Sequence, residues 1–154
     1  MALKMDRQVD AVELSYFCNE VVERGNVLSV LTGGSGISME NPKSVATAAA
    51  SSANARPIGI LLNDVVDVDV TRVPLNWFKD QQRVGDKVTL LTHGWVVTNR
   101  IVGSPQAGQR AVLASSGAIA PVAVGTADAA TAPIVGRFRS GLSEEGFAKV
   151  YIEL

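Results

Sequence analysis

The sequence has few of the residues from which most catalytic and metal sites are built. Its 154 residues include one cysteine, one histidine and only 5% aromatic side chains. A single cysteine, Cys18, cannot form a disulfide within the chain, and a single histidine, His93, excludes a metal site made of several histidines. We therefore expect no metal ion, no cofactor and no internal disulfide.

Charge is scarce as well, and it is balanced. Charged residues make up 19% of the chain, and 14 Lys and Arg against 15 Asp and Glu give a formal net charge of −1. Such a chain lacks the bulk positive charge with which proteins bind a phosphate backbone, so nucleic acid is not an expected partner. A surface with few charges is more typical of a chain covered in an assembly than of an isolated monomer.

Long apolar runs are also missing. No stretch approaches the roughly 18 apolar residues of a membrane span, so no membrane association is expected. Residues 1–8 lack the apolar core of a signal peptide, and together with the low cysteine content this predicts maturation in a reducing cytoplasm. The length fits one domain with a buried core.

What the sequence does contain is a series of short β-rich runs between glycine turns, from residue 85 onward. Residues 134–139 and 147–154 flank a polar loop at 140–146 that has a glycine at each end. In residues 147–154, Ala, Val, Ile and Leu alternate with Phe, Lys, Tyr and Glu, the period of a strand with one face on a core. This pattern predicts a hairpin.

A second hairpin is predicted at His93-Gly94. The β-rich runs 88–92 and 95–98 flank this dipeptide. Two short β-rich runs separated by a two-residue X-Gly sequence are a direct hairpin signal, so the chain is expected to reverse there.

The N-terminal half is less regular. Residues 8–23 are read as an extended arm followed by a strand, and residues 26–31 and 57–63 as core strands. The connection 32–56 is rich in Gly, Ser and Ala and is expected to be a mobile loop. Within it, Asn41-Pro42 resembles a helix N-terminus and suggests a helical turn at 43–50.

These elements predict an all-β or mainly β fold. Residues 109–114 are expected to form a strand and residues 120–132 a loop. The fold class is a small β-barrel or sandwich, β-tulip-like, made of antiparallel hairpins. The expected organisation is an N-terminal arm or strand at 1–24 and a single β-rich domain at 25–154.

Two segments carry residues that could bind a phosphate or a cation. The glycine-rich residues 33–36 could direct backbone amides at an anion, but the Gly-Lys-Ser/Thr ending of a P-loop is absent. Asp64, Asp67 and Asp69 could offer oxygen ligands to a hard cation, yet the glycine turn and the bidentate glutamate of an EF-hand loop are missing. A surface loop and a solvated strand face are the favoured interpretations.

The remaining candidates do not combine into a catalytic group. His93 is interpreted as a turn residue and Cys18 as a small buried hydrophobe. No Gly-x-Ser-x-Gly turn of a hydrolase is present, so we expect no enzymatic activity. Trp77 and Phe78 form the densest aromatic pair and are equally compatible with a core position and with an interface anchor.

From residue 56 to the end, the sequence resembles the head-decoration, or cement, proteins of tailed bacteriophages. The likeness rests mainly on glycine and turn positions. They lie in residues 57–59, 72–76, 84–88, 92–96, 107–108, 116–117, 134–138 and 146–150. For residues 8–56 no family pattern is matched.

The resemblance implies a structural virion protein on the outer capsid surface. Such proteins are small β-rich domains, often homotrimers, that clamp neighbouring copies of the major capsid protein. The expected partners are therefore the major capsid protein and other copies of this chain. The chain is expected to be made in the host cytoplasm. The expected interface residues are Val12, Leu14, Tyr16, Phe17, Trp77 and Phe78.

The balanced charge favours attachment through apolar area and through strand addition by residues 11–17. Deleting residues 1–17 is then expected to weaken attachment while the C-terminal β domain stays folded. Two other interpretations stay open. One is another phage structural component, of the tail or baseplate. The other is a trimeric β-rich nucleotide-binding enzyme such as a deoxyuridine triphosphatase, although the Tyr-Arg-Gly type segment of those enzymes is absent.

Overall fold

The structure is a computed structural model of the 154-residue chain. It describes residues 3–4, 12–18, 20–30, 45–48, 55–62, 67–68, 78–79, 81–82, 87–122 and 132–154. Within these ranges the regular structure is β-strand except for one short 3₁₀ turn, η1 (Ser115–Gly117). The predicted mainly β fold is confirmed, and the main sheet is nearly closed and barrel-shaped.

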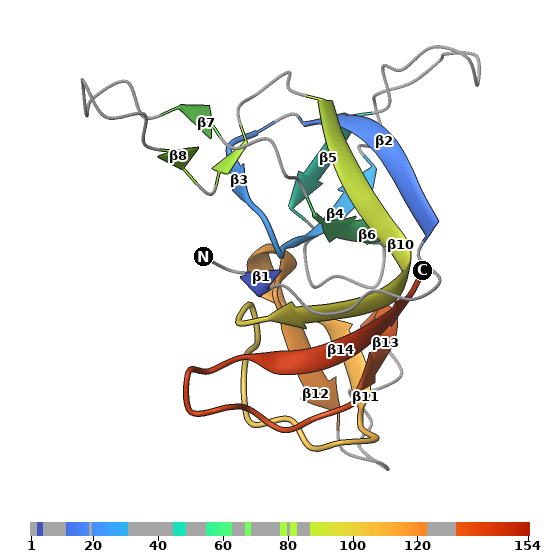
Figure 1. The fold of residues 1–154 in the computed structure, drawn as a ribbon. Helices are drawn as coiled ribbons and strands as arrows, with labels where there is room; N and C mark the ends of the chain where they lie inside the picture. Colours follow the sequence, from blue (N-terminus) through green and yellow to red (C-terminus); the bar gives the residue numbers. More distant parts are fainter. Residues whose placement is uncertain are drawn as a thin grey trace.

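Figure 1 shows the strands coloured in chain order. Their bounds are β1 (Leu3–Lys4), β2 (Val12–Cys18), β3 (Val22–Glu23), β4 (Val27–Val30), β5 (Val45–Ala48), β6 (Pro57–Leu61), β7 (Asp67–Val68), β8 (Phe78–Lys79), β9 (Gln81–Gln82), β10 (Lys87–Thr98), β11 (Arg110–Leu113), β12 (Ile119–Val122), β13 (Ile134–Phe138) and β14 (Ala148–Glu153). Ten of them form one sheet, while β3 pairs with β9 and β7 with β8.

The longest strand is β10, and it contains the dipeptide at which a hairpin was predicted. That prediction is wrong, because the chain continues through His93 and Gly94 as one 12-residue strand. The pairing register with β2 shifts between Leu91 and His93, and Gly94 has φ 145, a conformation that L side chains rarely adopt. The glycine therefore lets β10 bend from one group of strands to another, as Figure 1 shows.

The N-terminal part of β10 closes a first ring of strands. It pairs with β2 on one edge and with β6 on the other. β2 pairs in parallel with β5, β5 with β4, and β4 with β6. These pairings return to β10, so the group has no unpaired end strand. We call this group of β2, β4, β5, β6 and β10 the first ring.

The C-terminal part of β10 belongs to a second ring. It pairs with β14, which pairs with β13, then β11 and β12 follow in order. A parallel bridge joins Ile119 of β12 to Ile101, three residues beyond the end of β10. The Val102 amide donates to the Ile119 carbonyl at 2.9 Å, and the Ile119 amide donates to the Arg100 carbonyl at 2.9 Å, which closes this second ring.

Three strands of the first ring are buried on both faces. Register pairs place Leu90 opposite Leu61, and Leu91 opposite Ile60. One face packs inside the first ring and the other against the core of the second ring, around Phe138. Because side chains alternate along a strand, adjacent residues serve different cores. The consecutive, fully buried pairs are Val27-Leu28, Ile60-Leu61 and Leu90-Leu91.

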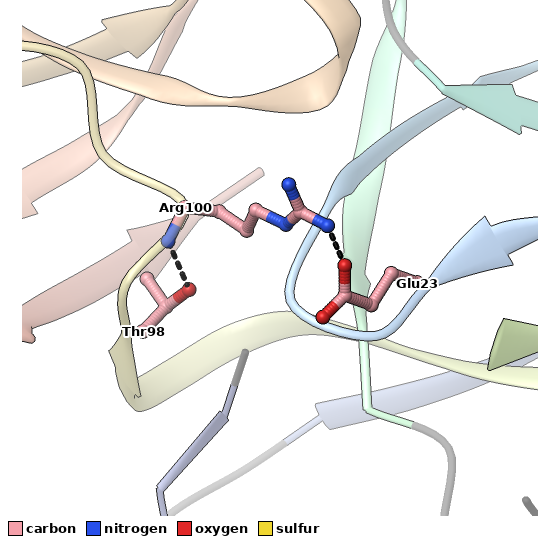
Figure 2. A network of polar contacts seen from close by, with 3 residues as sticks. All are labelled: Glu23, Thr98 and Arg100. Atoms are coloured by element: carbon pink, nitrogen blue, oxygen red, sulfur yellow. Dashed lines mark hydrogen bonds and ion pairs between the residues drawn. The ribbon is translucent and has the colours of Figure 1, made fainter. Parts of the chain in front are cut away.

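Two contacts outside the ladders join the rings. An ideal Cβ placed on Gly117, in η1, would lie 2.7 Å from the Val27 carbonyl oxygen, so the turn can approach β4 only as glycine. Figure 2 shows the other contact, an ion pair between Arg100, just after β10, and Glu23 of β3, the strand that leads into β4 of the first ring. The Arg100 amide also donates to the Thr98 hydroxyl oxygen at 3.0 Å, which fixes the chain as it leaves β10.

Several smaller predictions have clear outcomes. The hairpin of residues 134–154 is confirmed as β13 and β14. The helical turn predicted at 43–50 is wrong over Val45–Ala48, which is strand β5 because the edges of β4 and β2 offer it backbone partners. The start of the loop predicted at 120–132 is wrong, because residues up to Val122 belong to strand β12, which pairs with β11. The rest of the predicted loop at 32–56 lies largely outside the described residues.

Candidate functional site

The outward side chains of the second ring form a row across four strands. Arg110 of β11 is the register partner of Arg137 of β13, and Arg137 is the partner of Tyr151 of β14. Tyr151 in turn faces Trp95 of β10. Their neighbours along each strand are buried, so alternation directs these four side chains to the outer face.

Aromatic side chains make up the centre of this face. The rings of Trp95 and Tyr151 pack edge to face, with centroids 4.8 Å apart and an interplanar angle of 61°. The Tyr151 hydroxyl is hydrogen-bonded to His93 Nε2 at 2.6 Å, and the two rings are T-shaped at 5.2 Å. Such pairs contribute about 0.5–1.5 kcal/mol beyond the area they bury. The three rings therefore form a fixed platform.

Two cations lie over this platform. The Arg139 guanidinium carbon is 5.0 Å from the Trp95 ring centroid and 5.6 Å from that of Tyr151. Lys149 Nζ is 5.4 Å from the Trp95 ring. The Arg139 amide donates to the Lys149 carbonyl at 2.8 Å, which continues the β13–β14 ladder up to these residues. Backbone pairing and cation–π attraction together hold the two charges beside each other.

We call this surface the basic face. It consists of His93, Trp95, Arg110, Arg137, Arg139, Lys149 and Tyr151. The exposed Glu153 lies at its edge, opposite His93 in the register. Four cations and one carboxylate give the face and its edge a formal charge of +3. The other described residues include six Lys or Arg and six Asp or Glu, so the net positive charge of the described part of the chain is concentrated on this face.

The four cations of this face are suited to binding an anion. Within the described ranges, no three His, Cys, Asp or Glu residues are grouped so that they could hold a metal ion. Cys18 is 1% exposed, and its thiol donates to the Glu20 carbonyl at 3.0 Å, which agrees with the predicted buried hydrophobe. The part of the chain that the structure describes contains no helix that could cross a membrane.

The predicted interface residues are distributed over several elements. Val12, Leu14, Tyr16 and Phe17 belong to β2, which pairs with β10 in the first ring. Of their side chains only that of Tyr16 is described, and it packs half-buried against the core of the first ring.

The other predicted residues lie at or beyond the limits of the described ranges. Phe78 is in β8, where its register partner is Val68, and Trp77 lies outside the described residues. Asp67 is in β7 opposite Lys79, whereas Asp64, Asp69 and residues 33–36 also lie outside. The expected role of these residues at an interface stays a prediction.

Sequence reasoning missed the basic face. The alternation in residues 147–154 already placed Lys149 and Tyr151 on the outer side of their strand. The other members come from β10, β11 and β13, and only the register brings them to the same place. Assigning every charged residue to the inner or outer face of its strand would have revealed an excess of outward arginines, which net charge conceals.

Comparisons with known proteins give a structural likeness. No protein family and no curated protein sequence matches the chain. Among solved structures, the N base of head fiber gp8.5 of bacteriophage phi29 is similar, with 13% identity, a TM-score of 0.49, and coverage of 94% of this chain and 95% of that one. A likeness of this size does not establish a family.

Proposed function

We propose that the chain is a structural protein of a tailed-bacteriophage particle. It binds the outer surface of the capsid and stabilises the shell by joining neighbouring major capsid subunits. It is made in the host cytoplasm and takes its place in the virion during assembly. In this role it acts through surfaces and has no catalytic task.

The observation that carries the proposal is the resemblance of residues 56–154 to head-decoration proteins, together with the structural role of the glycines on which it rests. Gly117 has φ 73 and packs against Val27 without room for a Cβ. At Gly136 a Cβ would overlap the Tyr151 carbonyl oxygen. These glycines are fixed by backbone geometry, so the resemblance concerns a fold built for rigidity and not an active site.

Two features of the proposal concern assembly and activity. The chain forms a homotrimer, because a surface with few charges is covered without open ends in a cyclic assembly. Light scattering should give three times the monomer mass at micromolar concentration, and a monomer mass would contradict this.

The chain hydrolyses no nucleotide, peptide or ester, and turnover that is lost on changing Asp67 or Asp69 to Asn would contradict that.

The central experiment is imaging of particles. Particles purified from an infection should carry the antibody-labelled protein on their heads, and empty capsids of the cognate major capsid protein should bind the purified chain in co-sedimentation. Label confined to tails, together with no binding to capsids, would overturn the proposal in favour of a tail or baseplate component. A deletion mutant of the phage should yield capsids that open at lower temperature.

A further inference from the structure

We propose that the basic face is the docking surface for a carboxylate-rich protein surface, such as an acidic patch on the partner to which the chain attaches. The inference rests on the proposed function, because it names the chemistry of that contact. It departs from the expectation that attachment depends mainly on apolar area and strand addition. Four observations carry it.

Cations lie over the Trp95 and Tyr151 rings of the platform. Arg139 lies over both Trp95 and Tyr151, and Lys149 lies over Trp95. Nucleic acid bases bind such platforms by stacking on free aromatic faces. Here the rings support cations instead, so the group presented to a partner over the platform is the exposed Arg139 guanidinium.

The cations are also held in place before a partner arrives. Arg139 contacts two rings, and its backbone amide is bonded to the Lys149 carbonyl. A long side chain that is already ordered loses less conformational entropy when it binds. A guanidinium presents a planar fork of N–H donors that matches the two oxygens of a carboxylate. The geometry therefore favours a carboxylate over an apolar contact.

Two further arginines sit directly opposite each other without a described counter-ion. Arg110 and Arg137 are exposed register partners on adjacent strands. Like charges in this position repel and destabilise a sheet. Among the described residues neither forms an ion pair with an acidic side chain. A carboxylate placed between them would convert this repulsion into two attractive contacts.

The charge distribution selects a local acidic surface over a long polyanion. Outside the basic face and Glu153, the described residues carry six positive and six negative side chains, so a nucleic acid that extends beyond the face meets no further net positive charge there. A patch of a few carboxylates needs none beyond the face. The face spans three strand spacings from Arg110 to Trp95, about 14 Å, which accommodates several acidic side chains of a folded partner.

The test compares two charge reversals in the full chain. Arg137→Glu should weaken binding to capsids of the cognate major capsid protein by at least about tenfold, because an attractive contact becomes repulsive. Binding of the unmodified chain should fall as salt is raised, and this dependence should be smaller in the variant. Arg56→Glu is the matched control, since Arg56 is exposed and lies just before β6 of the first ring.

A stability measurement separates a binding role from a structural one. Arg137→Glu turns the like-charge pair with Arg110 into an attractive pair, so the urea midpoint of the variant should be equal or higher while its binding is lost. A binding loss with a lowered midpoint would instead indicate damage to the fold and would overturn the inference.

The outcomes distinguish the two levels of the proposal. If Arg137→Glu binds capsids as strongly as the unmodified chain does, and raised salt does not weaken binding, the docking surface is overturned and the proposed function stays intact. No capsid binding by the unmodified chain overturns both. Binding to a polyglutamate peptide should exceed binding to a single-stranded DNA oligonucleotide of equal charge. The reverse order, lost in Arg137→Glu, would replace the acidic protein with nucleic acid.

Discussion

The two rings that share β10 are closed in different ways. The first ring joins strands spread over residues 12–98, and it includes the parallel pair of β2 and β5 and the pairing of β2 with β10. The second ring is built largely from neighbours in sequence, with β12 following β11 after five residues and β14 following β13 after nine. Long loops must close before the first ring can form, whereas two hairpins of the second need only local turns.

The comparison shows how one strand, β10, can belong to two rings that are built in different ways. The first ring contributes Val27, Ile60 and Leu91 to the core of the second. Both rings therefore bury the same three-strand wall, one on each side. We expect them to unfold as one cooperative unit despite their different construction.

The largest loss of stability is expected from removing β2, which pairs with the shared strand β10. Deleting residues 1–17 removes all but the last residue of β2 and leaves one edge of β10 without its partner in the first ring. The structure thus changes the expectation that the C-terminal β domain stays folded after this deletion. Circular dichroism in a urea titration should show loss of the cooperative transition. A truncated chain with an unchanged midpoint would show that the second ring is independent.

Cavities in the two cores should next show whether the rings are coupled. Phe138→Ala in the second ring should cost about 3–5 kcal/mol and Leu90→Ala in the first about 2–5 kcal/mol, since both side chains are fully buried. Hydrogen exchange should report reduced protection in both β6 and β11 for either variant. If Phe138→Ala lowers protection in the second ring alone, the rings unfold separately.

The contact between η1 and β4 should have a smaller effect. Gly117→Ala should cost about 2–3 kcal/mol, because φ 73 is strained for alanine and the new Cβ would press against the Val27 carbonyl. Gly108→Ala is the control, with φ 90 and no atom within 4 Å of the added carbon. It should cost about 1 kcal/mol. Equal urea midpoints for the two variants would show that the turn does not support the junction of the rings.

The smallest effect is expected at the ion pair between the rings. Glu23→Gln should lower stability by about 0.2–1 kcal/mol, because the Arg100 and Glu23 side chains are 38% and 27% exposed and solvent screens the attraction. A double-mutant cycle with Arg100→Gln isolates the pair, and the coupling should shrink at high salt. A coupling that is large and independent of salt would mean that the pair is buried when the protein is in solution.

Local patterns in the sequence predicted the second ring well. Residues 147–154 alternate cleanly and follow a glycine turn, and Gly146 has the positive φ of 78 that such a turn requires. Long-range pairing decided the rest. His93-Gly94 has the composition of a hairpin turn, yet β2 and β14 occupy opposite edges of β10 there and keep the chain extended. The identity of those partners is not encoded within the dipeptide.

The candidate site was harder to predict for the same reason. Arg110, Arg137, Tyr151 and Trp95 are neighbours only through three consecutive strand pairings. Val45–Ala48 shows the limit of local signals in another way. Its proline-capped, alanine-rich context suggested a helical turn, but the open edges of β4 and β2 determined that it became a strand.

The continuity of β10 also determines how the molecule carries a mechanical load. A pull applied at Trp95 or at its partners on β14 reaches the first ring along one unbroken backbone, with no loop between the two. Ladder hydrogen bonds on both edges of β10 then resist sliding together, so several must break at once before the strand moves. Resistance to force is governed by the rate of unfolding. A strand held in this way should slow that rate more than side-chain contacts between two separate domains would.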